Sequence, residues 1–374
     1  MSRASNIYRL GIKELWSLLR DPMMLVFIIY SFTFQIYMAA SGVPEHLSKI
    51  PIAIVDEDDS QLSARIASAF YLPEFLPPKR VTLSEVDPGL DAGLYTFTLS
   101  IPPNFQRDVL AGRSPAIQLN VDATRMSQAF IGSGDAQQIV LGEVNEFVQR
   151  YRDNPTPPVD LALRVRFNPS MTHGWFMSVM EIINNVTMLS IILAGAALIR
   201  EREHGTIEHL LVMPVNPGEI MLGKIWSMGL VVFLGTAFSL HFVVQGALRV
   251  PIEGSVGLFL AVATLHIFST TSMGIFMGTL ARSMPQFGLL IMLILLPMQM
   301  LSGGMTPRES MPLFAQNMME VAPTTHFVVA AQAILYRGAG FDVVWPQFLA
   351  LAIIGAAFFV ATLARFRKTI SLMA

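Results

Sequence analysis

The side chains with the greatest capacity for chemistry form one run of charges, Arg200-Glu201-Arg202-Glu203-His204, directly after an apolar stretch. No nucleophile–base pair or metal-ligand spacing accompanies it, and the absence of cysteine excludes thiolate chemistry, disulfides and Cys-type zinc sites. Further on, Gly223-Lys224 is followed by isoleucine and lacks the glycine frame of a GxxxxGK[ST] phosphate loop. We therefore expect no catalytic residue, metal site or cofactor in this chain. If ATP with Mg is the fuel, a partner subunit must hydrolyse it.

The segment 200–224 around this run has the signals of a structured loop. Gly205 suits the end of a helix and Thr206 can begin another, so we expect a short helix over 207–213 that stops at Pro214. The sequence Asn216-Pro217-Gly218-Glu219 then predicts a capping box at the start of the next helix. Leu210 and Leu211 on the short helix have two interpretations: they dock into a partner, or they rest among lipid headgroups.

The composition of the chain indicates that membrane-spanning helices flank this loop. The chain has 374 residues, 53% hydrophobic and only 14% charged, with a net charge of −2 and a mean hydropathy of +0.52. Soluble domains are about 25% charged, so much of the chain must avoid water. A near-neutral charge gives no support for nucleic-acid binding. Six apolar runs are long enough to predict membrane spans, and the first is better explained as an anchor than as a cleaved signal peptide. They are residues 22–40, 175–199, 225–247, 256–280, 287–301 and 344–364.

Lys and Arg set the predicted orientation. They concentrate in residues 1–21, an amphipathic segment, in 200–224, and in the tail 365–374, and they are sparse in the short loops on the other side. Both termini are therefore expected to be cytoplasmic. The glycine- and proline-broken segment 302–343 is expected to form re-entrant or outer-surface helices before the last span.

Residues 41–174, expected outside the membrane, have a soluble composition and the size of a domain. Alternating strand and helix patterns predict a small α/β domain with a long helix over 124–151. The acidic run 56–59 lacks the spaced ligands and glycine of a calcium loop, so we interpret it as a solvated turn before a helix.

Polar side chains inside the spans need a reason, because hydrocarbon penalises them. Glu181, Asn184 and Asn185 share one helical face of the second span, and His241 is expected at a similar depth on the third. Two hypotheses remain open: the four residues line an export path or outer gate, or they hold helices together by hydrogen bonds. His266 lies nearer the middle of the fourth span.

The loop and its surroundings resemble the ABC-2-type permeases, specifically the inner-membrane subunits of bacterial multidrug-type exporters with a large periplasmic insert. The resemblance covers essentially the whole chain, including an amphipathic elbow helix and six spans. Its main motif residues are Glu201, Arg202, Gly205, Thr206, Glu208, Leu210, Leu211, Pro214, Glu219, Gly223 and Lys224. It implies that residues 201–214 couple the spans to a cytoplasmic ABC ATPase, and that two permease copies or paralogues assemble.

The fold class expected is therefore a polytopic α-helical protein of the bacterial inner membrane, with an α/β domain in the periplasm. The expected function is export of a drug-like, lipid or other amphiphilic substrate; the resemblance also suggests a periplasmic adaptor and an outer-membrane channel as partners. An ion-coupled secondary transporter would need charged relays and repeated halves, which the sequence does not show. A membrane-anchored sensor would use the outer domain but would not need five further spans.

Overall fold

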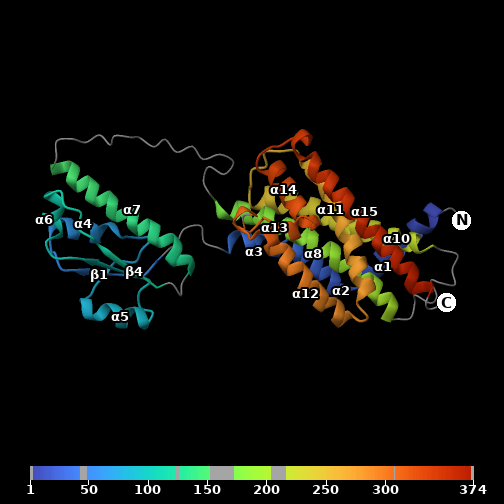
Figure 1. Ribbon diagram of the computed structural model, residues 1–374, viewed down its shortest axis with the longest axis horizontal. Helices are drawn as coiled ribbons and strands as arrows, with labels where there is room; N and C mark the ends of the chain where they lie inside the picture. The colour runs from blue at the N-terminus through green and yellow to red at the C-terminus, as the bar shows by residue number, and fades with distance from the viewer. Residues whose placement is uncertain are drawn as a thin grey trace. The chain divides into compact units, whose positions relative to one another are not determined.

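The structure is a computed structural model, and it describes residues 3–42, 49–122, 126–151, 172–203, 216–306 and 308–371. The chain divides into two compact units (Figure 1). The first, the helical unit, combines Met1–Val43 with Val165–Ala374, and the second, the outer unit, is Pro44–Arg164. Each unit has its own hydrophobic core.

Helices make up the helical unit, and α1 and the end of α15 lie at the same end of it (Figure 1). The side of the membrane on which that end lies stays a prediction. In chain order the elements are α1 (Arg3–Leu19), α2 (Pro22–Phe32), α3 (Phe34–Ser41), α8 (His173–Glu203), α10 (Pro217–Phe238), the π-helix η1 (Ser239–Ala247), α11 (Val256–Leu280), α12 (Met284–Met300), the 3-10 turn η2 (Arg308–Ser310), α13 (Leu313–Met319), α14 (Pro323–Leu335) and α15 (Phe341–Ser371).

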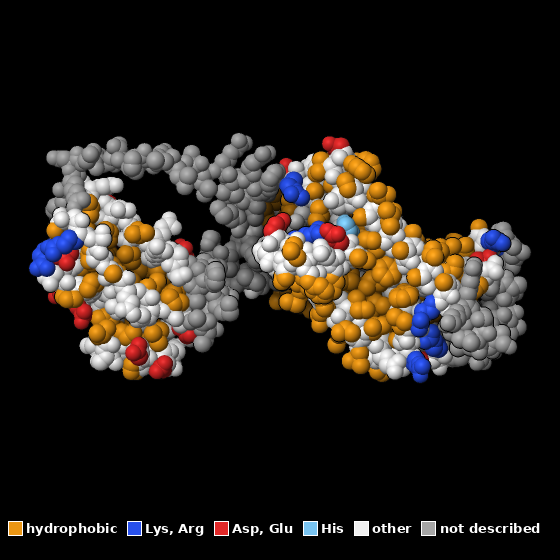
Figure 2. All heavy atoms as spheres, in the orientation of Figure 1, with side chains coloured by type: hydrophobic (Ala, Val, Ile, Leu, Met, Phe, Trp, Pro, Cys, Tyr) orange, Lys and Arg blue, Asp and Glu red, His pale blue; other side chains and the backbone are white. Residues whose placement is uncertain are grey.

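Five stretches of helix in the described residues are long and apolar enough to cross a membrane, which makes the chain a polytopic helical membrane protein. They lie at Pro22–Ser41, Gly174–Glu203, Pro217–Ala247, Val256–Leu280 and Phe341–Phe366. The predicted fifth span corresponds to α12, which is apolar but has only 17 residues, so the count of six stays a prediction. Hydrophobic side chains cover most of the visible face of this unit (Figure 2).

The boundaries of these helices differ from the apolar runs at their polar ends. The second span continues through the charged run to Glu203, and the third begins at Pro217 rather than 225. The third span begins earlier because of the predicted capping box, which the structure confirms with Asn216 as N-cap and Glu219 as its partner. In the first span, Thr33 separates α2 from α3.

Helix α8 is the central helix, with most of its apolar window buried, and it packs most closely on α11. Their backbones approach at Gly274, where an added Cβ would lie only 2.4 Å from the carbonyl oxygen of Ile191. Gly278 follows four residues later, so α11 presents the small-xxx-small pattern that lets membrane helices pack closely. The helix that carries the charged run is therefore held firmly along its length.

The outer unit contains a four-stranded sheet in the order β2-β1-β3-β4. Strands β1 (Ile52–Asp56), β2 (Lys79–Arg80) and β3 (Phe97–Ile101) are parallel, and β4 (Gln118–Val121) is antiparallel to β3. Ile52 pairs with Phe97 and Phe97 with Val121, which places these side chains together in the core. The helices are α4 (Gln61–Ala69), α5 (Leu83–Asp91), α6 (Phe105–Leu110) and α7 (Met126–Tyr151), of which α7 corresponds to the predicted long helix and α5 was not predicted.

Candidate functional site

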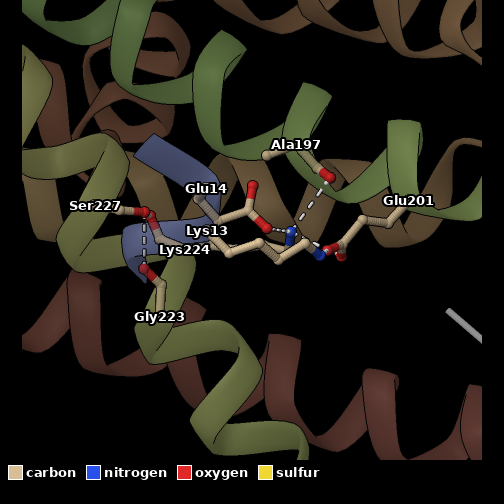
Figure 3. A network of polar contacts seen from close by, with 7 residues as sticks. All are labelled: Lys13, Glu14, Ala197, Glu201, Gly223, Lys224 and Ser227. Carbon is tan, nitrogen blue, oxygen red and sulfur yellow. Dashed lines mark hydrogen bonds and ion pairs between the residues drawn. The ribbon is translucent and has the colours of Figure 1, made fainter. Parts of the chain in front are cut away.

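A buried ion cluster joins three helices at the end of α8 (Figure 3). The Nζ of Lys224, on α10, lies 2.7 Å from Glu14 of α1 and 2.8 Å from Glu201 of α8. It also donates to the carbonyl oxygen of Ala197, at 3.3 Å. Lys13 of α1 donates to the other carboxylate oxygen of Glu201, at 2.6 Å. We call Lys13, Glu14, Glu201 and Lys224 the inner cluster.

Burial and charge balance characterise the inner cluster. The side chains of Lys224 and Glu14 are 2% and 8% exposed, whereas that of Lys13 is 50% exposed. Two cations face two anions, so the cluster has no excess charge to place in a poorly solvated site. The Lys224 ammonium donates hydrogen bonds to Glu14 and to the carbonyl oxygen of Ala197, and it forms an ion pair with Glu201.

The pKa values on α1 reflect this competition between burial and pairing. Burial raises the pKa of Glu14 above its ordinary range, and the charge of Lys224 opposes the rise without cancelling it. For Lys13, burial lowers the pKa, but the hydrogen bond with Glu201 and the charges of Glu201 and Glu14 outweigh it, so the pKa is raised.

The other three members of the run Arg200–Glu203 each contact a different element. Successive residues on a helix point about 100° apart, so four in a row reach most of the way around α8. Their partners lie at the start of α2, at the end of α11 and at the start of α12. The contacts are Arg200 with Asp21 at 2.9 Å, Arg202 with the carbonyl oxygen of Ala281 at 2.5 Å, and Glu203 with the backbone N–H of Met284 at 2.9 Å. The run is thus a junction for the helix ends on this side.

Helix α1 lies against α10 through further specific contacts. An added Cβ on Gly11 would lie 2.1 Å from the ring of Trp226, so only glycine permits this approach. The indole N–H of Trp226 donates to the carbonyl oxygen of Ile7, and its ring stacks on Tyr8. Asn6 donates to Glu219, the capping residue of α10. The amphipathic helix is therefore bound to the third span and is not only an interfacial helix.

The remaining predicted coupling residues, Gly205, Thr206, Glu208, Leu210, Leu211 and Pro214, lie outside the described residues. Their role stays a prediction. Glu201 and Arg202 are described, and both connect α8 to neighbouring helices.

The predicted polar cluster in the spans is distributed over different contacts. Glu181 accepts a hydrogen bond from Gln35 of α3, and Asn185 donates to the carbonyl oxygen of Ser31 at 2.7 Å. Both bonds connect the second span to the first, as interhelical hydrogen bonding would. The carbonyl oxygen of Asn184 accepts from the side chain of Gln299 on α12, at 3.4 Å.

The two intramembrane histidines differ. His241 is exposed, and it contacts Gln245 and Phe242 of its own helix, η1. His266 is fully buried, where its ring stacks on Phe327 at 4.2 Å and its Nε2 lies 2.8 Å from the Thr187 hydroxyl. Among the described residues, no hydrogen bond or ring contact joins His241 to Glu181, Asn184 or Asn185. That these residues line an export path stays a prediction.

Sequence reasoning missed Lys13, Glu14 and Gln35 as members of these contacts. One signal was available for Glu14. Ile7, Leu10 and Leu18 mark the apolar face of the first helix, and Glu14 lies on that face, four residues from Leu10 and Leu18. A carboxylate on a buried face needs a partner, but its identity depends on tertiary structure.

Comparison with known proteins now decides the family. The model of the ABC-2 family transporter proteins matches residues 15–364, which include the last turn of α1, the junction and nearly the whole of every helix that could span a membrane. The chain belongs to the ABC-2 transporter family. This ABC-2 permease is 63% identical, over the full length of both chains, to a protein of Escherichia coli K12 named inner membrane transport permease YhhJ.

More distant relatives carry a more specific description. The ABC-2 permease is 27% identical to the E. coli K12 protein named probable multidrug ABC transporter permease YbhR, over 96% of this chain and 97% of the relative. It is 24% identical to YbhS, which has the same description, over 89% of each chain. Together with the apolar helices, these similarities make the protein a multi-pass protein of the inner membrane and an ABC transporter permease.

Proposed function

We propose that this permease is the membrane subunit of an exporter that is driven by ATP hydrolysis in a separate cytoplasmic ABC ATPase. The observation that carries the proposal is the family match across residues 15–364 together with the junction at the base of α8, directly before the predicted coupling segment. The sequence contains no phosphate loop, which supports placing the ATPase on a separate chain.

The proposal includes further elements. Two permease copies or paralogues form the path, the outer unit lies in the periplasm, and the substrate is a drug-like molecule, lipid or other amphiphile. The relatives described as multidrug ABC permeases support this substrate class. A periplasmic adaptor and an outer-membrane channel are proposed partners of the outer unit.

The docking segment is tested with a double substitution, Leu210→Asp and Leu211→Asp. The charged side chains should prevent an apolar surface of the ATPase from docking, so co-purification of the ATPase with the permease should be lost. Leu19→Asp is the matched control, because Leu19 is an exposed leucine of α1 outside the coupling segment. Normal recovery of the ATPase with the double variant would show that the docking assignment is wrong.

The energy source needs a separate test. Inactivating the hydrolytic site of the co-expressed ATPase should abolish the drug resistance that the transporter confers on cells. Resistance that persists with an inactive ATPase would instead favour an ion-coupled transporter.

A further inference from the structure

We propose that Lys224 is a positioning residue that fastens the inner ends of α1, α8 and α10 into one rigid body, the inner joint. When a force acts on the segment between α8 and α10, the elbow helix and the second and third spans then move together rather than separating. This inference rests on the proposed function only for the origin of that force. The joint itself is defined by contacts among described residues.

The inner cluster joins the two helices that flank the predicted docking segment. Glu201 lies two residues before the end of α8 at Glu203, and Lys224 lies in the second turn of α10. The residues between these helices are the predicted ATPase-docking segment. Both attachment points of that segment are therefore connected to each other by the 2.8 Å contact between Glu201 and Lys224.

The buried ammonium group of Lys224 fixes the positions of the helices relative to one another. Apolar helix surfaces can slide past each other with little change in energy, because hydrophobic contact is not directional. The Lys224 ammonium instead has one acceptor on α1 and two on α8, namely Glu14, Glu201 and the carbonyl oxygen of Ala197. Sliding α10 along either helix would leave a buried charge without a partner, which is costly. Fixing register is the best-attested use of buried polar groups.

Independent contacts make the proposal testable, because they hold α1 on α10 without the inner cluster. Asn6 bonds Glu219, and Trp226 bonds Ile7 and packs against Gly11. A variant that lacks the charges should therefore keep α1 in register on α10, while α8 loses its fixed register against these two helices. This separates positioning from simple stabilisation.

The test uses spin-label distances in the full permease bound to its ATPase in lipid nanodiscs. Because the chain has no natural cysteine, paired cysteines can be labelled without background. One pair is at Trp16 and Leu222, on α1 and α10, and the other is at Glu203 and Leu222, on α8 and α10; all three side chains are exposed. In the wild type, both distances should be narrow, and they should be the same without nucleotide and with ATP and vanadate.

The variant combines Glu14→Leu, Glu201→Leu and Lys224→Met, which replaces the ions with apolar side chains of similar size. We expect a melting temperature close to wild type and a narrow Trp16–Leu222 distance, but a broader Glu203–Leu222 distance that shifts when nucleotide is added. Arg20→Met, at an exposed arginine of the α1–α2 turn, is the control and should behave as wild type. A narrow, unshifted Glu203–Leu222 distance in the folded triple variant would overturn the proposal.

If the triple variant fails to fold, the label distances in the wild type still test whether the three helices move as one body. Separation of either label pair between the two nucleotide states would show that the three helices are not one body. Failure of the ATPase to bind would count against the proposed function alone. The nucleotide-free comparison of wild type and triple variant would then still test whether the cluster fixes the register.

Discussion

The ammonium of Lys224 and a carboxylate oxygen of Glu201 lie 2.8 Å apart, although the two residues belong to helices on opposite sides of the predicted coupling segment. Glu14 of the elbow helix completes the contact from a third element, more than 200 residues from Lys224 in the sequence. This relationship connects the amphipathic N-terminus to the two helices that an ATPase would move.

Replacing Lys224 alone should be much more harmful than replacing Glu14, Glu201 and Lys224 together. Lys224→Met leaves Glu14 and Glu201 buried with one cation fewer, so the free energy of unfolding should fall by about 3–5 kcal/mol. Thermal unfolding of the purified permease in detergent measures the effect. Lys13→Met is the matched control, since half of that side chain is exposed, and it should cost about 1 kcal/mol or less. Equal losses for the two variants would contradict the burial argument.

The raised pKa of Glu14 predicts a pH dependence with a definite sign. A carboxyl whose pKa is higher in the folded state stabilises the fold most at low pH, and that contribution is lost as pH rises from the ordinary value of 4.5 through the folded-state pKa. The melting-temperature difference between wild type and Glu14→Gln should therefore shrink as pH rises over this interval. A difference that grows with pH would mean that the attraction of Lys224 outweighs burial.

The two intramembrane histidines should respond differently to truncation. His266→Ala removes a buried ring packed on Phe327 and its contact with the Thr187 hydroxyl, so the unfolding free energy should fall by roughly 2–4 kcal/mol. His241→Ala removes an exposed ring and should change it by about 0.5 kcal/mol or less. Melting temperatures measured side by side check the contrast, and a larger loss at His241 would refute it.

Glu181 distinguishes helix association from a charged export path. Glu181→Gln keeps the size of the side chain and its ability to bond Gln35, so we expect normal membrane abundance and unchanged drug resistance in cells. Glu181→Leu removes the interhelical bond and should lower the melting temperature. If the Gln variant is abundant but the cells lose resistance, the negative charge itself takes part in transport.

Local signals in the sequence predicted much of this structure. The apolar runs coincide with helices because each must satisfy its backbone hydrogen bonds inside the bilayer. The start of α10 could be predicted from Asn216 and Glu219, because a capping box involves only four consecutive residues. The mixture of strands and helices in the outer unit and its long helix were predicted from equally local patterns, but strand β2 and helix α5 were not predicted.

The contacts between helices could not be predicted from the sequence. No local pattern identifies Lys224 as the partner of Glu14, and none predicts the side chains around His241. That residue lies in the π-helix η1, where hydrogen bonds reach five residues back instead of four. The wider turn rotates every side chain away from the direction that a regular α-helix would give it.

The equal numbers of cations and anions in the inner cluster have a practical consequence for ionic strength. Dissolved salt screens exposed charges at distances beyond about 10 Å at 0.1 M, but it weakens buried pairs much less. Lys224 and Glu14 are nearly inaccessible to ions, and their neutral cluster attracts no counterion atmosphere. Concentrated salt should therefore dissociate a subunit that is held by surface charges before it separates α1 from α8 and α10. After the salt is removed, the permease would still have these three helices joined and could bind the subunit again.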